Sequence, residues 1–213
     1  MHLTVHLAAV TTVVVAAVSP FSLAYCRCPT RAEAEAAVRT LIRWAGDDPA
    51  REGLLATPAR VVRAYEEWFA GYRQDPAELL SRTFGEVGGY DEVVILRDIP
   101  LQSTCEHHMA AITGVVHIAY LPCRRVVGIS KLARLVEALG RRLQIQERLT
   151  AEIADTLARV LQPRGVAVIV EASHACLSSR GVRAHGVSMQ TRRLLGEFAR
   201  EPRRREILAA LAG

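Results

Sequence analysis

The sequence predicts an α+β fold in which helices precede a predominantly antiparallel sheet, with two helices inserted between the hairpins of that sheet. Three observations lead to this prediction. Apolar residues recur at helical spacing up to Tyr72, follow a strand-like pattern from Val93, and return to helical spacing twice before the last strands. A chain of 213 residues that is 50% hydrophobic and 23% charged can bury the core that such a domain needs.

Residues 1–29 precede the predicted domain. They contain the apolar run LAAVTTVVVAAV, which is too short to span a bilayer as a helix. The run resembles the apolar part of a signal peptide, but no Lys or Arg precedes it and no small-x-small cleavage site follows cleanly. We therefore expect a dispensable extension, disordered or arising from a misassigned start, before one domain over residues 30–213. Export is the alternative.

Two helices open the domain. Thr30 and Glu33 form a capping box at the start of the first helix. Thr57 and Pro58 supply an N-cap and a proline at the first helical position of the second. The apolar positions of the second helix are Val61, Val62, Tyr65, Trp68, Phe69 and Tyr72. Such aromatic residues are typical of a packed core rather than of a cofactor-binding stack.

The segments after Val93 predict the sheet and its inserted helices. EVVILRDIPLQS and GVVHIAYLP predict strands on either side of a turn at residues 105–108, and RRVVGI predicts a returning strand. Helical spacing covers residues 132–139 and 149–160. GVAVIVEASHAC and HGVSMQTRRLL predict the last strand pair, and PRRREILAALA predicts a terminal amphipathic helix.

The clearest chemical signal is STCEHHM, in which a thiol and two imidazoles lie within four positions. Cys105 and His108 are three residues apart, a spacing at which both side chains reach one metal ion from a single turn. His174 and Cys176 share a face if their segment is a strand. Cys105, His108 and Cys176 would form a Cys2His set with the fourth tetrahedral position open, as in a catalytic zinc site. His107 and His174 would lie beside it.

On spacing alone, this metal site and the ordinary interpretation of cysteine as a small buried apolar residue fit equally well. Cys26, Cys28 and Cys123 have no nearby His, and the ordinary interpretation applies to them. Five cysteines, an odd number, do not resemble a disulfide framework. We therefore expect reduced thiols and a cytoplasmic protein.

The charge of the chain favours a small anionic ligand. The net charge is +5, but aromatic residues make up only 5% of the chain and no basic run is interleaved with them. We therefore expect neither a nucleic acid nor a membrane as partner. Among 27 Lys and Arg residues, Lys131 is the only lysine, and it follows Ser130 at a predicted helix start that would attract phosphate. The position of a single lysine can also arise by chance.

Five separated blocks carry a resemblance to a known family. In order they are DPAREGLLATPARV, STCEHHM, VVGISKLARLVE, QIQERLT and EASHACLSSRGVR. Over about residues 30–210 the chain resembles GTP cyclohydrolase I, the zinc enzyme that opens the pteridine branch of folate and tetrahydrobiopterin synthesis. The resemblance implies the tunnelling fold (T-fold). It also implies a homodecamer whose active sites lie at subunit junctions.

The resemblance also implies the chemistry of the site. Cys105, His108 and Cys176 would bind Zn2+, and His107 and His174 would transfer protons. GTP would be hydrolysed at C8 of its guanine ring, lose formate and rearrange to 7,8-dihydroneopterin triphosphate. The family's substrate-binding positions correspond to Glu147 for guanine and to Ser130, Lys131, Arg134 and Arg180 for the triphosphate. Without the motif, Glu147 would be interpreted as an ordinary exposed helix residue.

Two segments depart from the family pattern. Met189, Gln190 and Arg192 stand where a run of Thr, Ser and Val is expected, and MAAIT lacks a proline expected after the ligand histidine. Neither departure affects the expected metal ligands. The alternative function is a non-catalytic, zinc-stabilised T-fold subunit with an assembly or regulatory role, which would need neither His107, His174 nor Glu147.

Overall fold

The computed structural model describes residues 28–85 and 90–212, so nearly all of the expected N-terminal extension lies outside the described residues. The helices are α1 (Arg31–Trp44), α2 (Thr57–Trp68), α3 (Pro76–Leu79), α4 (Ile129–Gly140), α5 (Gln146–Leu161), α6 (Ala175–Ser178) and α7 (Arg203–Ala212), with 3-10 turns η2 (Glu52–Leu54), η3 (Ala70–Arg73) and η4 (Glu197–Ala199). The strands are β1 (Thr83–Phe84), β2 (Val94–Cys105), β3 (Ala111–Leu121), β4 (Val126–Val127), β5 (Leu143–Gln144), β6 (Gly165–His174) and β7 (Met189–Gly196).

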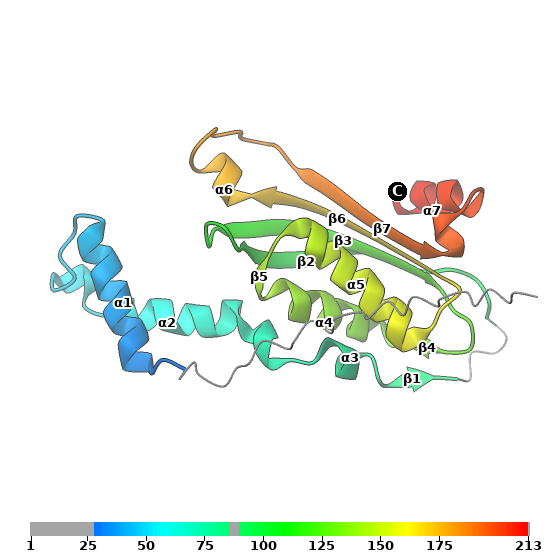
Figure 1. Cartoon of the computed structure of the whole chain (residues 1–213), viewed down its shortest axis with the longest axis horizontal. Helices are drawn as coiled ribbons and strands as arrows, with labels where there is room; N and C mark the ends of the chain where they lie inside the picture. Colours follow the sequence, from blue (N-terminus) through cyan, green and yellow to red (C-terminus); the bar gives the residue numbers. More distant parts are fainter. Residues whose placement is uncertain (1–27, 86–89, 213) are drawn as a thin grey trace, which may run out of the picture.

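The main sheet has the strand order β5-β2-β3-β6-β7 (Figure 1). Its pairs are antiparallel except for the short β5, which runs parallel to the end of β2. The strands β1 and β4 form a separate two-stranded sheet. Helices α4 and α5 lie between β4 and β6 in the chain, so the predicted mixed α+β architecture with two inserted helices is confirmed.

The main core lies between the sheet and helices α4 and α5. It is formed by fully or nearly fully buried aliphatic side chains, among them Ile99, Leu101, Val116, Ile118, Leu132, Leu135, Ile153, Leu157, Val168 and Val170. A smaller cluster on the other sheet face packs Phe198, Ile207 and Leu211 against β3 and β6. The alternation of side chains along each strand therefore fills two layers, one under α4 and α5 and the other under α7.

The N-terminal helices differ from the expectation. The capping box of Thr30 and Glu33 is present, but α1 buries none of its residues and the Trp68 side chain of α2 is 53% exposed. The prediction that this aromatic face belongs to the core is therefore wrong for Trp68, for Tyr65, which is 37% exposed, and for Tyr72, which is 59% exposed. The reason is that α1 and most of α2 extend beyond the sheet, where within this chain they pack mainly against each other (Figure 1).

Two helix starts are also shifted by one or two residues. The N-cap of α2 is Ala56 rather than Thr57, and the N-cap of α4 is Gly128 rather than Ser130. Neither cap residue accepts a side-chain hydrogen bond. Ser130 and Lys131 therefore stand inside the first turn of α4. Within the described residues, every helix falls short of the length and apolar character needed to cross a membrane.

Gly114 allows β3 and β6 to approach closely. A Cβ at this position would lie 2.0 Å from the carbonyl oxygen of Glu171 and 2.6 Å from the Cα of Ala172. We expect Gly114→Ala to lower the free energy of unfolding by about 1–3 kcal/mol, because the two strands must move apart. Denaturant titration measures the change.

A suitable control for Gly114→Ala is Gly128→Ala. At Gly128 an added Cβ would meet only the Phe84 ring, at 3.9 Å, and the backbone has φ −60° and ψ 135°, which alanine adopts without strain. The control should keep wild-type stability. Equal stability of the two variants would contradict the assigned close contact between β3 and β6.

Candidate metal and substrate site

Two chain reversals at the same end of the sheet bring the predicted metal ligands together. Cys105 ends β2 and His108 lies in the turn to β3. The prediction that His174 and Cys176 share the face of one strand is wrong, because β6 ends at His174 and Cys176 lies in the short helix α6 that follows. The antiparallel register of β3 and β6 places Ile112 opposite His174, so both reversals meet at this end. The ligand atoms of Cys105, His108 and Cys176 all lie within 4.8 Å of one another.

The backbone of the β2–β3 turn fixes two of these ligands. The Cys105 N–H donates to the carbonyl oxygen of Ala110, and the Met109 N–H donates to that of Cys105, both at 2.8 Å. Met109 takes a left-handed conformation with φ of 51°. The turn folds back tightly enough that the Sγ of Cys105 lies 4.0 Å from the Nδ1 of His108. This places a thiol and an imidazole side by side.

The surroundings of the Cys176 thiol change its pKa. Burial raises the pKa of the Cys176 thiol above its ordinary value, and the hydrogen bond to Cys105 raises it further. A metal ion that binds thiolates must displace these protons, so metal affinity is expected to fall as the pH falls. Two thiolates and one imidazole are the donors that Zn2+ prefers, and the three atoms are close enough to share one ion.

A cavity of about 260 Å³ adjoins the three ligands. Its lining residues are Cys105, His107, His108, Ile112, Gln144, Ile145, Gln146, Glu147, His174 and Cys176. The structure thus brings together the two predicted proton-transfer histidines, His107 and His174, and the predicted guanine-binding Glu147. His174 ends β6, and Glu147 stands in the first turn of α5.

Of the four predicted phosphate-binding residues, Arg180 is the one that lies beside the metal ligands of its own chain. Its Nη1 is 3.1 Å from the Nε2 of His108. Cys28 and Cys123, which were expected to be buried, are exposed, because both stand in irregular segments outside the core. Cys26 lies outside the described residues.

Ser130, Lys131 and Arg134 lie elsewhere. The end of α4 at Gly140 approaches Gln102 of β2, and β5, which follows it, pairs with Cys105. Ten residues of helix separate Ser130 from Gly140, which corresponds to about 15 Å. Figure 1 accordingly shows the start of α4 near β4, away from α6. Within a single chain, none of Ser130, Lys131 and Arg134 is among the residues that line the cavity at the metal ligands.

Two residues that the sequence reasoning did not assign also contact the site. Arg148 forms an ion pair with Glu106, the residue between Cys105 and His107, and donates to the carbonyl oxygen of Leu143 at 3.1 Å. Gln146 is 1% exposed and bonds to His174. Both flank Glu147 in QIQERLT, but nothing in their spacing identifies their partners, because these lie on other strands and turns.

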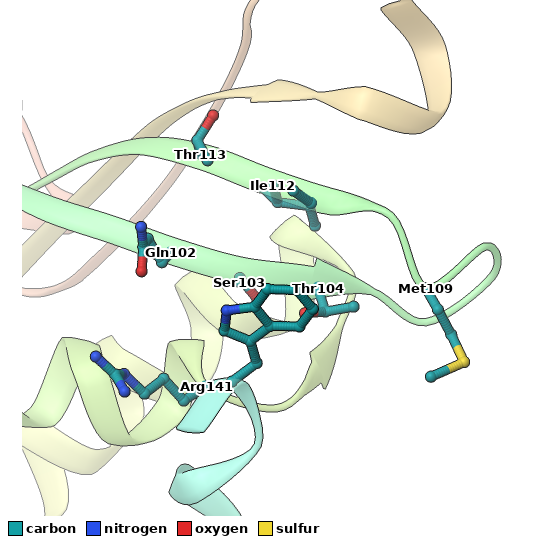
Figure 2. A pocket seen from close by; sticks show the side chains of 9 residues that line it. Gln102, Ser103, Thr104, Met109, Ile112, Thr113 and Arg141 are labelled. Atoms are coloured by element: carbon teal, nitrogen blue, oxygen red, sulfur yellow. The ribbon is translucent and has the colours of Figure 1, made fainter. Parts of the chain in front are cut away.

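A second cavity, of about 290 Å³, lies near the same turn (Figure 2). Ile112 lines both cavities, whereas the other labelled side chains come from β2, β3, the turn at Met109 and the end of α4. Ser103 is 7% exposed, and its hydroxyl has no hydrogen-bond partner among the described residues. None of the residues that line this cavity is Cys, His, Asp or Glu, so it offers no metal site.

Comparisons with known proteins show which family the chain is related to. The GTP cyclohydrolase I family model matches residues 34–212. The GTP cyclohydrolase 1 of Maricaulis maris (strain MCS10) is 59% identical over 170 residues, which cover 80% of this chain and 83% of that protein. The GTP cyclohydrolase 1 of Brucella anthropi is 57% identical over 170 residues, with 80% of each chain covered.

One solved structure is similar at a lower level. The apo crystal structure of the archaeosine synthase QueF-Like aligns with 49% of this chain and 93% of that chain, at 19% identity and a TM-score of 0.41. That likeness is too low to assign the fold. The match of the family model over residues 34–212 and the identities near 60% decide the relationship: this chain belongs to the GTP cyclohydrolase I family.

Proposed function

We propose that this protein hydrolyses GTP and rearranges it to 7,8-dihydroneopterin triphosphate with release of formate, as the first step of folate or pterin synthesis. The observation that carries the proposal is the single cavity that joins the Cys105, His108 and Cys176 group to Glu147, His107 and His174. A site that only stabilised the fold would not need a carboxylate and two further histidines around the same cavity.

Zn2+ is the metal that we propose for this site. Cys105, His108 and Cys176 would hold it, and three protein ligands leave a tetrahedral position free. Bound there, zinc would supply Lewis acidity for hydrolysis of the guanine ring. Because its thiol ligands must stay reduced, we also propose a cytoplasmic location.

The protein's own side chains would bind the substrate and move protons. The Glu147 carboxylate would accept hydrogen bonds from N1–H and the 2-amino group of guanine, which lie side by side. His107 and His174 would accept and return protons during ring opening and closure, since imidazole changes charge near neutral pH. Arg180, which contacts His108, would bring a positive charge toward the triphosphate.

The triphosphate site is proposed to form between copies of the chain. Ser130, Lys131 and Arg134 lie on α4, away from the metal ligands of the same chain, so a neighbouring copy would supply them. The strands β5 and β7 at the sheet edges and the exposed side chains of Trp68 and Tyr72 are surfaces that an assembly would cover. We propose the T-fold and the homodecamer of the family, with residues 30–213 as the catalytic domain.

The direct test is to incubate the purified, zinc-loaded oligomer with GTP. Formate and, after oxidation, a fluorescent pterin are expected in equal amounts. Formate without pterin would mean that the reaction ends after ring opening. If neither product forms, the result would favour the alternative of a non-catalytic, zinc-stabilised subunit.

Mixed oligomers test the shared site. Lys131→Ala and Cys176→Ser are each expected to inactivate a homogeneous oligomer. A 1:1 mixture of the two subunits should regain about one quarter of wild-type activity, because about one quarter of the junctions would combine an intact Cys176 from one subunit with an intact Lys131 from its neighbour. Activity of the mixture is measured after mass spectrometry has verified mixed subunits. Absence of any recovery in verified mixed oligomers would contradict the supply of Lys131 by a neighbour.

A further inference from the structure

We propose that Gln146 is a positioning residue that orients the imidazole of His174 and determines which of its nitrogens carries the proton. The inference rests on the proposed function, in which His174 transfers protons. Gln146 is the first residue of α5 and is 1% exposed. Its Oε1 lies 2.8 Å from the Nε2 of His174. A buried side chain with this contact acts on the reaction through His174 rather than through the substrate.

The orientation of the Gln146 amide follows from its other contacts. Its Nε2 lies 3.0 Å from the carbonyl oxygen of Val170, 2.9 Å from that of Met189 and 3.2 Å from the hydroxyl of Thr191. Two of these atoms are backbone carbonyl oxygens, which only accept hydrogen bonds. Rotating the amide by half a turn would place its oxygen against both carbonyl oxygens. The NH2 group must therefore face them, and Oε1 must face His174.

The same reasoning fixes the hydrogen on His174. Because Oε1 of Gln146 can only accept, Nε2 of His174 must donate, and it therefore carries a hydrogen. In the neutral ring the lone pair is then on Nδ1. The bond from Nε2–H to Gln146 fixes the ring and leaves Nδ1 as the nitrogen that can accept a hydrogen bond. Gln146 thus holds the ring in one orientation throughout proton transfer.

The hydrogen bonds around Gln146 link the three elements α5, β6 and β7. Thr150, one turn further along α5, donates to the Gln146 carbonyl oxygen at 2.7 Å, and its hydroxyl lies 2.6 Å from that of Thr191 on β7. Val170 on β6 and Met189 on β7 contribute backbone oxygens. Since Met189 takes part through its backbone, its departure from the family pattern does not remove this contact.

Substitution of Gln146 tests the positioning role. Gln146→Met keeps the length and unbranched shape of the side chain but removes the bond to His174. We expect kcat to fall about 10- to 100-fold, with KM and zinc content close to wild type. The matched control is Thr191→Val, which removes one hydroxyl from the same network and leaves the contact between Oε1 and His174. Equal loss of kcat in both variants, or unchanged kcat in Gln146→Met, would overturn the proposal.

The position of the hydrogen on the His174 ring can be measured without GTP turnover. In protein labelled with 15N-histidine, the signal lost in His174→Ala identifies this ring by nuclear magnetic resonance. The zinc-loaded wild type is expected to show the hydrogen on Nε2, and Gln146→Met is expected to lose this preference. A hydrogen on Nδ1 of neutral wild-type His174 would overturn the proposal even if the enzyme is active. Absence of GTP turnover would instead refute the proposed function and leave this measurement valid.

Discussion

Cys176→Ser is expected to abolish stoichiometric zinc binding and, with it, turnover of GTP. Cys176 is the ligand that α6 brings to the pair in the β2–β3 turn, and its ligand atom lies within 4.8 Å of those of Cys105 and His108. A serine hydroxyl is not deprotonated as a thiol is and is a weaker ligand for zinc, so two ligands would remain. Zinc content per subunit and formate release are measured on the same preparation.

The control for this variant is Cys123→Ser. Cys123 is exposed and does not line the cavity at the metal ligands. Its substitution should leave both zinc content and turnover unchanged. Full zinc content in Cys176→Ser would refute the assignment of Cys176 as a ligand. Comparable losses in both variants would point to a general effect of losing a thiol.

His174→Ala is expected to retain zinc and to lower kcat by about 10²- to 10⁴-fold, the contribution typical of general acid–base catalysis. His174 lines the cavity, but the group that could share an ion consists of Cys105, His108 and Cys176. Removing the imidazole should therefore separate proton transfer from metal binding. Zinc analysis and steady-state kinetics with GTP provide the two readouts.

His117→Ala is the matched control for His174→Ala. His117 lies on β3 and lines a cavity formed with α7 on the other face of the sheet. This variant should keep both zinc and turnover. Undiminished turnover in His174→Ala would overturn the acid–base role of His174, and loss of zinc from that variant would place His174 among the ligands.

The mixed-oligomer prediction concerns the phosphate side of the site. Lys131 and Arg180 were both expected at the triphosphate, yet only Arg180 lies beside His108. The mixed-oligomer experiment separates these positions, because Lys131→Ala should be rescued by a neighbour that carries an intact α4. A loss of function caused by misfolding of the Lys131→Ala subunit would not be rescued in this way.

Much of the fold could be predicted from contiguous sequence. The capping box at Thr30 and Glu33 is present as expected, since it depends on residues three positions apart. The strand and helix patterns gave the correct order of the longer elements, because side-chain periodicity is a local property. The short α3, β1, β5 and α6 were not predicted, and β4 pairs with β1 outside the main sheet. The ends of helices were less predictable: Thr57 and Ser130 suit an N-cap chemically, but the chain enters each helix one or two residues earlier.

The sequence by itself indicated the longer helices and strands and the ligand chemistry, through the spacing of Cys105 and His108 and the presence of a second Cys beside His174. Only the tertiary structure decided that these segments meet, that Gln146 faces His174, that Trp68 stays exposed, and that Lys131 lies away from the metal ligands. The physical reason is that spacing and periodicity act within a few residues. Convergence of distant side chains depends on the register of β3 with β6 and on the packing of α4 and α5 against the sheet.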